Sequence, residues 1–178
     1  VAREFWERRG IRVVNIIGSS ETGTMVAWDS ATDREHPPSD FLPLPFTRAL
    51  VAGSAPGDGA QGTEAPVGER GNLWISTDGV LTAYLGNAPE TAKRLVLRDG
   101  LRWFDTQDLA VRQPNGRIRF VGRAKRVIKR GANLVYPEEI ESFLLTHPDV
   151  AAVAVQAEKH PLFGEAIVAH LQAAPGAT

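Results

Sequence analysis

The stretch FVGRAKRVIKRGANLVYPEEIE, from Phe120 to Glu141, determines how the chain is organised. It opens as a strand that ends at Gly122-Arg123 and continues as a basic, apolar strand. It then turns at a glycine and enters an acidic helix that begins with proline. A strand, a pivot and a helix in this order are typical of a junction between two structural units. We therefore predict a hinge here, with one unit before it and another after it.

The composition predicts a soluble, globular protein. With 178 residues and 43% hydrophobic content, the chain can bury a real core as one domain or two small ones. Its 20 basic and 21 acidic residues nearly cancel, so no global field would draw nucleic acid or an anionic membrane. Cysteine is absent, which excludes disulfides and leaves the cytoplasm as the default location.

The chain has no apolar run of membrane-spanning length, and its start has no signal-peptide core. It also begins with valine rather than methionine. We expect a chain that begins inside a longer gene product.

Several elements are predicted before the hinge. Ala2 to Arg9 reads as the end of an amphipathic helix, stopped by glycine. Ile11 to Ile17 is almost continuously apolar, which is typical of a parallel strand covered on both faces. Turns and short strands should fill Ala31 to Gly71, with a solvated surface loop at Ala52 to Val67.

Regular structure is expected again from Gly71 onward. Asn72 to Ser76 should be a strand, and Asn87 to Leu97 a short helix capped by its first residue. Asp105 to Arg112 and Arg117 to Val121 should pair as a hairpin.

A smaller unit is predicted after the hinge. Pro137 to Leu145 should be a helix, and Val150 to Ala157 and Ala166 to Leu171 should be antiparallel strands packed against it. The apolar face of that helix is predicted to consist of Ile140, Phe143 and Leu144.

Two clusters before the hinge could bind a nucleotide. The segment Gly18 to Gly23 offers backbone N–H groups and hydroxyls to phosphate oxygens, and Glu21 could hold a magnesium ion. Asp108, at a strand end beside aromatic residues, could accept two hydrogen bonds from a ribose diol. Taken singly, each has a structural alternative, because small-residue turns with an exposed glutamate and solvent-facing acids at hairpin ends are both common.

The hinge segment carries a third cluster. Arg123 could contact ribose or phosphate, and Lys125 lies where the backbone would absorb a change in φ and ψ. The alternative is a solvated basic hairpin face. A fourth group, His160 with Glu165 and His147 with Asp149, has no metal-pair or triad spacing and reads as surface histidines.

The order of these clusters resembles that of the core motifs of the adenylate-forming superfamily, which includes acyl-CoA synthetases, luciferases and peptide-synthetase adenylation domains. The resemblance covers Val13 to Leu171, and its last motif, Gly-Arg-x-Lys-x-x-Ile-Lys-x-x-Gly-x-Asn-x-x-x-Pro-x-Glu-Ile-Glu, is highly specific. Pro137 stands there as in acyl-CoA and aryl-CoA ligases. The successive matches are Gly18 to Glu21, Gly68 to Ile75 with Tyr84-Leu85, Thr106 to Leu109, and Gly122 to Glu141.

The resemblance implies a two-step reaction. A carboxylic acid attacks the α-phosphate of ATP with Mg²⁺ bound, and an acyl-adenylate and pyrophosphate result. The thiol of CoA, or of phosphopantetheine on an acyl carrier protein, then displaces AMP. The remainder of the same enzyme is an expected partner.

The resemblance also implies roles for individual residues. Glu21 would be the magnesium ligand and Ser20 the hydroxyl on the α-phosphate. Gly18 and Ile17 would lie at the nucleotide, with Ile17 where most members have a tyrosine stacked on adenine. The positions that line the acyl pocket correspond to Ile16, Thr24 and Met25.

The remaining implied roles lie at and around the hinge. Asp108 would hold the ribose diol, Arg123 would be a second nucleotide contact, and Lys125 would be the hinge residue. Gly131 matches the glycine whose missing side chain lets the pantetheine arm pass. Gln107 replaces the usual glycine before the ribose acid, which bears on the backbone geometry there.

The implied fold is mixed α/β and α+β. Residues 1–30 would end an α/β large domain, 31–122 would form a β-rich, barrel-like subdomain, 123–126 the hinge, and 127–178 a partial mobile α+β subdomain. The phosphate loop and the C-terminal lysine of the superfamily are not in the sequence, so we expect little adenylation by this chain alone. The competing hypothesis is a degenerate, noncatalytic module that binds a nucleotide or a partner.

Overall fold

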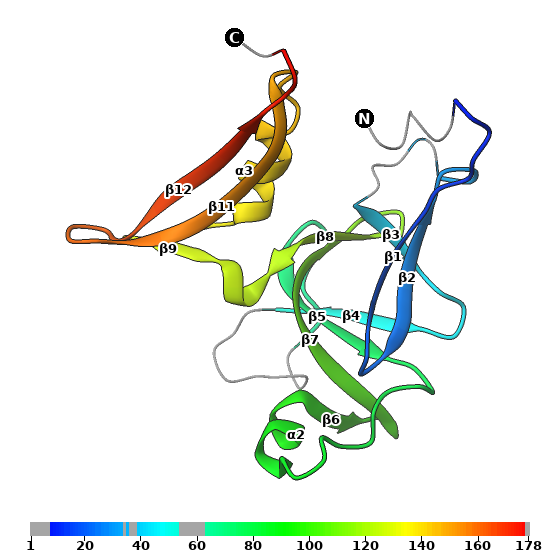
Figure 1. Ribbon diagram of the computed structural model, residues 1–178. Helices are drawn as coiled ribbons and strands as arrows, with labels where there is room; N and C mark the ends of the chain where they lie inside the picture. Colours follow the sequence, from blue (N-terminus) through cyan, green and yellow to red (C-terminus); the bar gives the residue numbers. More distant parts are fainter. Residues whose placement is uncertain (1–7, 34, 36–38, 54–62, 177–178) are drawn as a thin grey trace. The chain divides into compact units, whose positions relative to one another are not determined.

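The computed structural model describes residues 8–33, 35, 39–53 and 63–176 (Figure 1). Its contacts divide the chain into two compact units, Val1–Phe120 and Val121–Thr178. Most of the predicted helix at Ala2 to Arg9 lies outside the described residues. The finer division into an α/β end, a barrel-like subdomain and a hinge stays a prediction.

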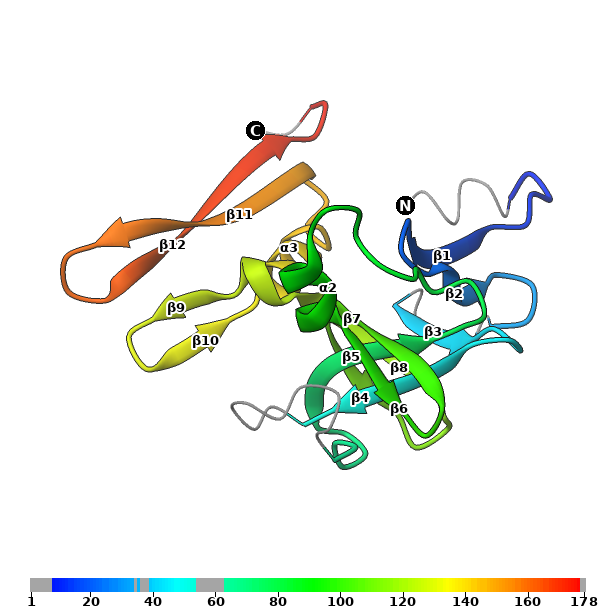
Figure 2. The same cartoon turned by 90° about the horizontal axis from the view of Figure 1, so that it is seen from below.

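One antiparallel sheet organises the described part of the first unit (Figures 1 and 2). Its strands follow the order β1-β2-β3-β8-β7-β5-β4, and β6 also pairs with β7. The pairings of the described strands form an open path rather than a closed ring, so the barrel-like shape is not confirmed. The elements are β1 Val14–Ser19, β2 Gly23–Asp29, β3 Asp40–Pro43, β4 Arg48–Ala52, β5 Arg70–Ser76, α2 Ala88–Arg94, β6 Leu95–Arg98, β7 Leu101–Arg112 and β8 Ile118–Arg123. The last residues of β8, from Val121 onward, belong to the second unit.

Strand β5 is buried on both faces. Leu73 and Ile75 join the main core cluster, whereas Trp74 packs on the opposite face with Leu50 and Ala52. The alternation of side chains along a strand explains this division, and the NLWIS run supplies apolar residues for both faces. The main cluster comprises Met25, Val26, Trp28, Phe41, Val51, Ala65, Leu73, Ile75, Ala110 and Ile118.

The prediction of a parallel strand buried on both faces at Ile11 to Ile17 is wrong. The strand is β1, it pairs antiparallel with β2, and it lies at one end of the sheet path. Val14 is 49% exposed and Ile16 54% exposed. An apolar run predicts a strand, but it does not determine which element covers that strand's faces.

The helix predicted at Asn87 to Leu97 ends earlier than expected. The Asn87 side chain accepts a hydrogen bond from the Glu90 N–H at 3.1 Å, which confirms the cap. Leu95 is already extended, with φ −109° and ψ 127°, and β6 pairs with β7. Pairing with β7 therefore overrides the local preference for helix. The predicted hairpin is confirmed as β7 and β8.

The second unit contains an antiparallel sheet in the order β10-β9-β12-β11, with α3 against β11. The predicted helix and its two strands are confirmed. Phe143, however, is 74% exposed, whereas Ile140 and Leu144 are half-buried, because only a narrow stripe of this short helix faces the sheet. The elements are the 3₁₀ helix η2 Ala124–Arg126, β9 Ile128–Arg130, β10 Asn133–Val135, α3 Pro137–Leu144, β11 Val150–His160 and β12 Gly164–Ala173. Among the described helices, none is long and apolar enough to cross a membrane.

Candidate nucleotide and acyl site

The predicted phosphate cluster forms the tight turn between β1 and β2. A side chain at Gly18 would come within 2.6 Å of the carbonyl oxygen of Gly23, so the two strands approach too closely for any residue but glycine. Within the turn, the Ser19 and Thr22 hydroxyls lie 3.0 Å apart. Ser20 stays exposed, so its hydroxyl is open to a ligand.

A tyrosine far along the chain holds Glu21. The Tyr84 hydroxyl donates a hydrogen bond to Glu21 Oε1 at 3.0 Å, and the Leu81 N–H donates to the Glu21 carbonyl at 2.8 Å. Burial and then the bond to Glu21 raise the pKa of the Tyr84 phenol, so the hydroxyl keeps its proton and remains a donor. Glu21 is thus a half-buried residue held by one distant segment through its backbone carbonyl, which accepts from Leu81, and through its carboxylate, which accepts from Tyr84.

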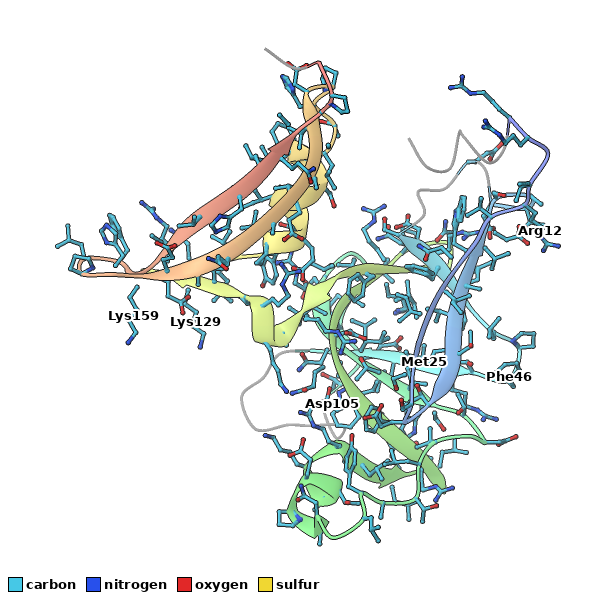
Figure 3. All side chains as sticks on the ribbon, in the orientation of Figure 1. Arg12, Met25, Phe46, Asp105, Lys129 and Lys159 are labelled. Carbon is cyan, nitrogen blue, oxygen red and sulfur yellow. The ribbon has the colours of Figure 1, made fainter. Side chains whose placement is uncertain are left out.

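The residues predicted to line an acyl pocket lie on the same hairpin with different exposure. Ile16 and Thr24 are exposed, whereas Met25 is 1% exposed and belongs to the core cluster. Met25 lies at the bulge where the register shifts, since Ile17 opposes Val26 and Gly18 opposes Thr24. Figure 3 shows Met25 on β2. For all three residues, the pocket role stays a prediction.

Asp108 lies in a kink of β7. The register against β5 shifts between Asn72 and Trp74, which is where Thr106 to Asp108 pass. The Thr106 hydroxyl donates to the Leu73 carbonyl at 2.9 Å and accepts from the Asp108 N–H at 3.1 Å. Asp108 itself is 2% exposed, so its side chain is almost fully buried where the register shifts.

Gln107 has the left-handed backbone that a glycine would supply, with φ 59°. Its N–H donates to Asp105 Oδ1 at 2.9 Å, and Asp105 is also paired with Arg94 at 3.2 Å. Asp105, labelled in Figure 3, lies on β7. Residue 107 therefore adopts, as glutamine, a backbone conformation that glycine accepts without steric cost.

The other predicted residues belong to the second unit. Arg123 and Lys125 are exposed, and Lys125 lies within η2. Gly131 turns the chain between β9 and β10 with φ 61°, and its N–H donates to the Phe163 carbonyl at 2.8 Å. Apart from its two chain neighbours, none of the described residues has a heavy atom within 4 Å of where a Cβ on Gly131 would be, so the turn is open on that side.

The histidines have local roles in turns. His160 Nδ1 accepts from the N–H groups of Leu162 and Phe163 at 3.2 and 3.3 Å, and the His160 and Phe163 rings stack with centroids 5.0 Å apart. His147 Nδ1 accepts from the Asp149 N–H at 3.2 Å.

Comparison with known proteins connects these features. A family model described as the AMP-binding enzyme C-terminal domain matches residues 139–178. The chain is 32% identical over 170 residues to the sulfoacetate–CoA ligase of Cupriavidus necator, a match that covers 95% of this chain and 31% of that protein. The feruloyl-CoA synthase of an Amycolatopsis species is 34% identical over 158 residues, covering 88% and 30%. The crystal structure of ATP-bound MatB from Rhodopseudomonas palustris superimposes with a TM-score of 0.78 at 30% identity, covering 93% and 31%.

This chain belongs to the adenylate-forming superfamily. It spans about a third of the length of these relatives.

The donor set at the turn fits a magnesium ion bound together with a nucleotide. Among the described residues, no group of three histidine, cysteine or acidic side chains could hold a metal by itself. Magnesium usually takes one or two carboxylates and completes its shell with substrate phosphates and water. Glu21, a single carboxylate beside an exposed hydroxyl, matches that need.

Tyr84 is the residue whose role the sequence did not predict. It lies 63 positions after Glu21, and no local pattern links the two. Tyr84 lies in a stretch that resembles a motif of the adenylate-forming superfamily. Its hydrogen bond to Glu21, however, depends on how the segment after β5 folds back onto the β1–β2 turn.

Proposed function

We propose that the protein activates a carboxylic acid with ATP as an acyl-adenylate and then transfers the acyl group to the thiol of CoA. The observation that carries the proposal is the 32% identity to a CoA ligase over 170 residues, or 95% of the chain. The turn at Gly18 to Glu21, Asp108 and the hinge motif follow one another along this sequence in the order of the superfamily's motifs. The alternative acceptor is the pantetheine thiol on an acyl carrier protein. The proposal includes a cytoplasmic location and a barrel-like middle subdomain.

Each residue of the proposed site has a defined task. The turn at Gly18 to Glu21 receives the phosphates, with the Ser20 hydroxyl on the α-phosphate. Glu21, oriented by Tyr84, would hold Mg²⁺, which neutralises charge on the phosphate oxygens when bound. Asp108 accepts the ribose hydroxyls.

The remaining tasks belong to the moving part. Arg123 contacts the nucleotide, and Lys125 absorbs the change of backbone dihedrals between the half-reactions. Gly131 leaves room for the pantetheine arm. Ile17 covers one face of the adenine without aromatic stacking, and Ile16, Thr24 and Met25 shape the acyl pocket.

The test is ATP–pyrophosphate exchange by the complete gene product across a panel of fatty, aryl, amino and hydroxy acids. We expect at least one acid to support exchange, and expect Asp108→Ala to lower it by about a hundredfold because two charge-assisted bonds are lost. Asp78→Ala, an exposed acid of the same unit, is the matched control and should leave exchange unchanged. If no acid supports exchange, the proposed reaction is wrong, and if Asp108→Ala matches the control, the assignment of the ribose acid is wrong.

A further inference from the structure

Arg126 makes a clasp at the end of the hinge segment. It closes η2, and its guanidinium donates to Glu138 Oε1 at 2.9 Å and to Glu141 Oε1 at 2.7 Å. The same group donates to the Val155 carbonyl at 3.2 Å. One side chain therefore joins the hinge segment to both α3 and β11.

The partners of Arg126 are themselves fixed. Glu138 and Glu141 are three residues apart on α3, so their side chains share one face of the helix. Glu141 Oε1 also accepts the Val155 N–H at 2.8 Å, which ties that carboxylate to β11. A planar guanidinium suits this arrangement because it can hold several acceptors at once, whereas a lysine ammonium is a point charge on a flexible stem.

The clasp is charged at neutral pH. The hydrogen bond to Glu141 is the main cause that raises the pKa of Arg126. Burial by itself would raise the pKa of Glu141, but the bonds from Arg126 and from the Val155 N–H outweigh it and lower that pKa. The interaction is thus an ion pair over the whole physiological range.

Glu138 also contacts the strand that precedes the hinge. A side chain at Gly122 would run into the Glu138 carboxylate, so the helix reaches the backbone at that position. Residues 123–125 therefore lie between Gly122 and Arg126, which both contact Glu138. A rotation in this segment must separate Gly122 from Glu138, while the bonds of Arg126 can persist.

Building on the proposed function, we propose that Arg126 is a positioning residue that fixes the far end of the hinge to α3 and β11. The rotation between half-reactions is then confined to residues 123–125. Residues 126–176 then move as one rigid body and bring the Gly131 turn to a defined place for thioester formation. From the sequence, Arg126 is one residue of a basic stretch with no predicted role, and its partners on α3 and β11 come only from the structure.

Hydrogen exchange tests the clasp without relying on activity. In the complete gene product, Arg126→Gln should speed amide exchange at residues 124–127 by about tenfold, because charge-assisted bonds that hold the segment are lost. Lys159→Gln is the matched control: it removes the same charge from an exposed residue of β11, labelled in Figure 3, and should leave those amides unchanged. Equal exchange in the two variants would overturn the anchoring role.

The two half-reactions test the positioning role. We expect Arg126→Gln to keep ATP–pyrophosphate exchange within about twofold and to lower thioester formation about tenfold, with Arg126→Lys in between. A general folding defect would lower both steps equally, and that result would overturn the proposal. Absence of exchange in the wild type would instead refute the proposed function, and with it the role of Arg126 in the reaction, whereas the hydrogen-exchange result would still decide whether the clasp exists.

Discussion

The backbone at Gln107 gives a quantitative prediction for the strand that carries Asp108. A non-glycine residue in the left-handed region costs about 1–2 kcal/mol, whereas glycine costs about 0.5–1 kcal/mol through the entropy of the unfolded chain. With φ at 59°, Gln107→Gly should therefore raise the free energy of unfolding by about 0.5 kcal/mol. Gln107→Val should lower it by about 1 kcal/mol or more, because a β-branched side chain fits this region poorly.

Urea denaturation of the full chain measures the order of stability at this position, which should be glycine, then glutamine, then valine. Leu97 on the extended strand β6, 73% exposed, is the control position, and there valine should be more stable than glycine. If Gln107→Val is as stable as wild type while Gln107→Gly is less stable, residue 107 does not adopt the left-handed conformation and the reasoning is refuted. ATP–pyrophosphate exchange should persist in Gln107→Gly, since the hydrogen bond from the Asp108 N–H to the Thr106 hydroxyl does not involve the Gln107 side chain.

Three further outcomes are expected. Asp33→Asn should lower the free energy of unfolding by about 3–5 kcal/mol, because Arg117 would stay buried without its charged partner. Burial by itself would raise the pKa of Asp33, but its hydrogen bonds, above all the one from Arg117, lower that pKa. Denaturation of the wild type at different pH values should therefore show that this stabilisation is complete above the ordinary pKa of an aspartate. It should be lost as the pH falls through the pKa of Asp33 in the folded protein. Tyr84→Phe should raise the Mg²⁺ concentration needed for half-maximal exchange about tenfold, because Glu21 loses the donor that orients it; an unchanged requirement would remove Glu21 from the metal site. Gly131→Ala should slow thioester formation while exchange persists, and a parallel loss of both would show that the turn has no specific part in the second step.

The sequence predicted best the features that depend on neighbouring residues. Asn87 caps α2, Pro137 opens α3, and Gly131 turns the chain after β9, because caps, proline and glycine act through the local backbone. The short strand β10 that follows Gly131 was not predicted. The order of these local signals also led to the family. The close approach of β1 and β2 at Gly18 was not predicted, because it depends on the antiparallel pairing of the two strands.

The sequence predicted least well the features that depend on distant elements. The exposure of Ile16 and the burial of Met25 follow from which strands lie beside β1 and β2, and the apolar character of the two residues is similar. Tyr84 and Arg126 contact residues that are far away in the sequence. The sequence shows that each side chain can donate a hydrogen bond, but it does not show which residue accepts it.

The two departures from the family pattern have different weight for the choice between an enzyme and a noncatalytic module. Gln107 keeps the left-handed backbone, so the position of Asp108 does not depend on having glycine there. Ile17 is half-buried and packs against the core cluster, so its side chain is partly occupied in stabilising the fold and offers less surface to an adenine than a tyrosine would. Under the proposed function, Ile17 is therefore the departure that bears on nucleotide binding. Its apolar side chain would weaken the contact with the base, while the proposed phosphate and ribose contacts involve other residues.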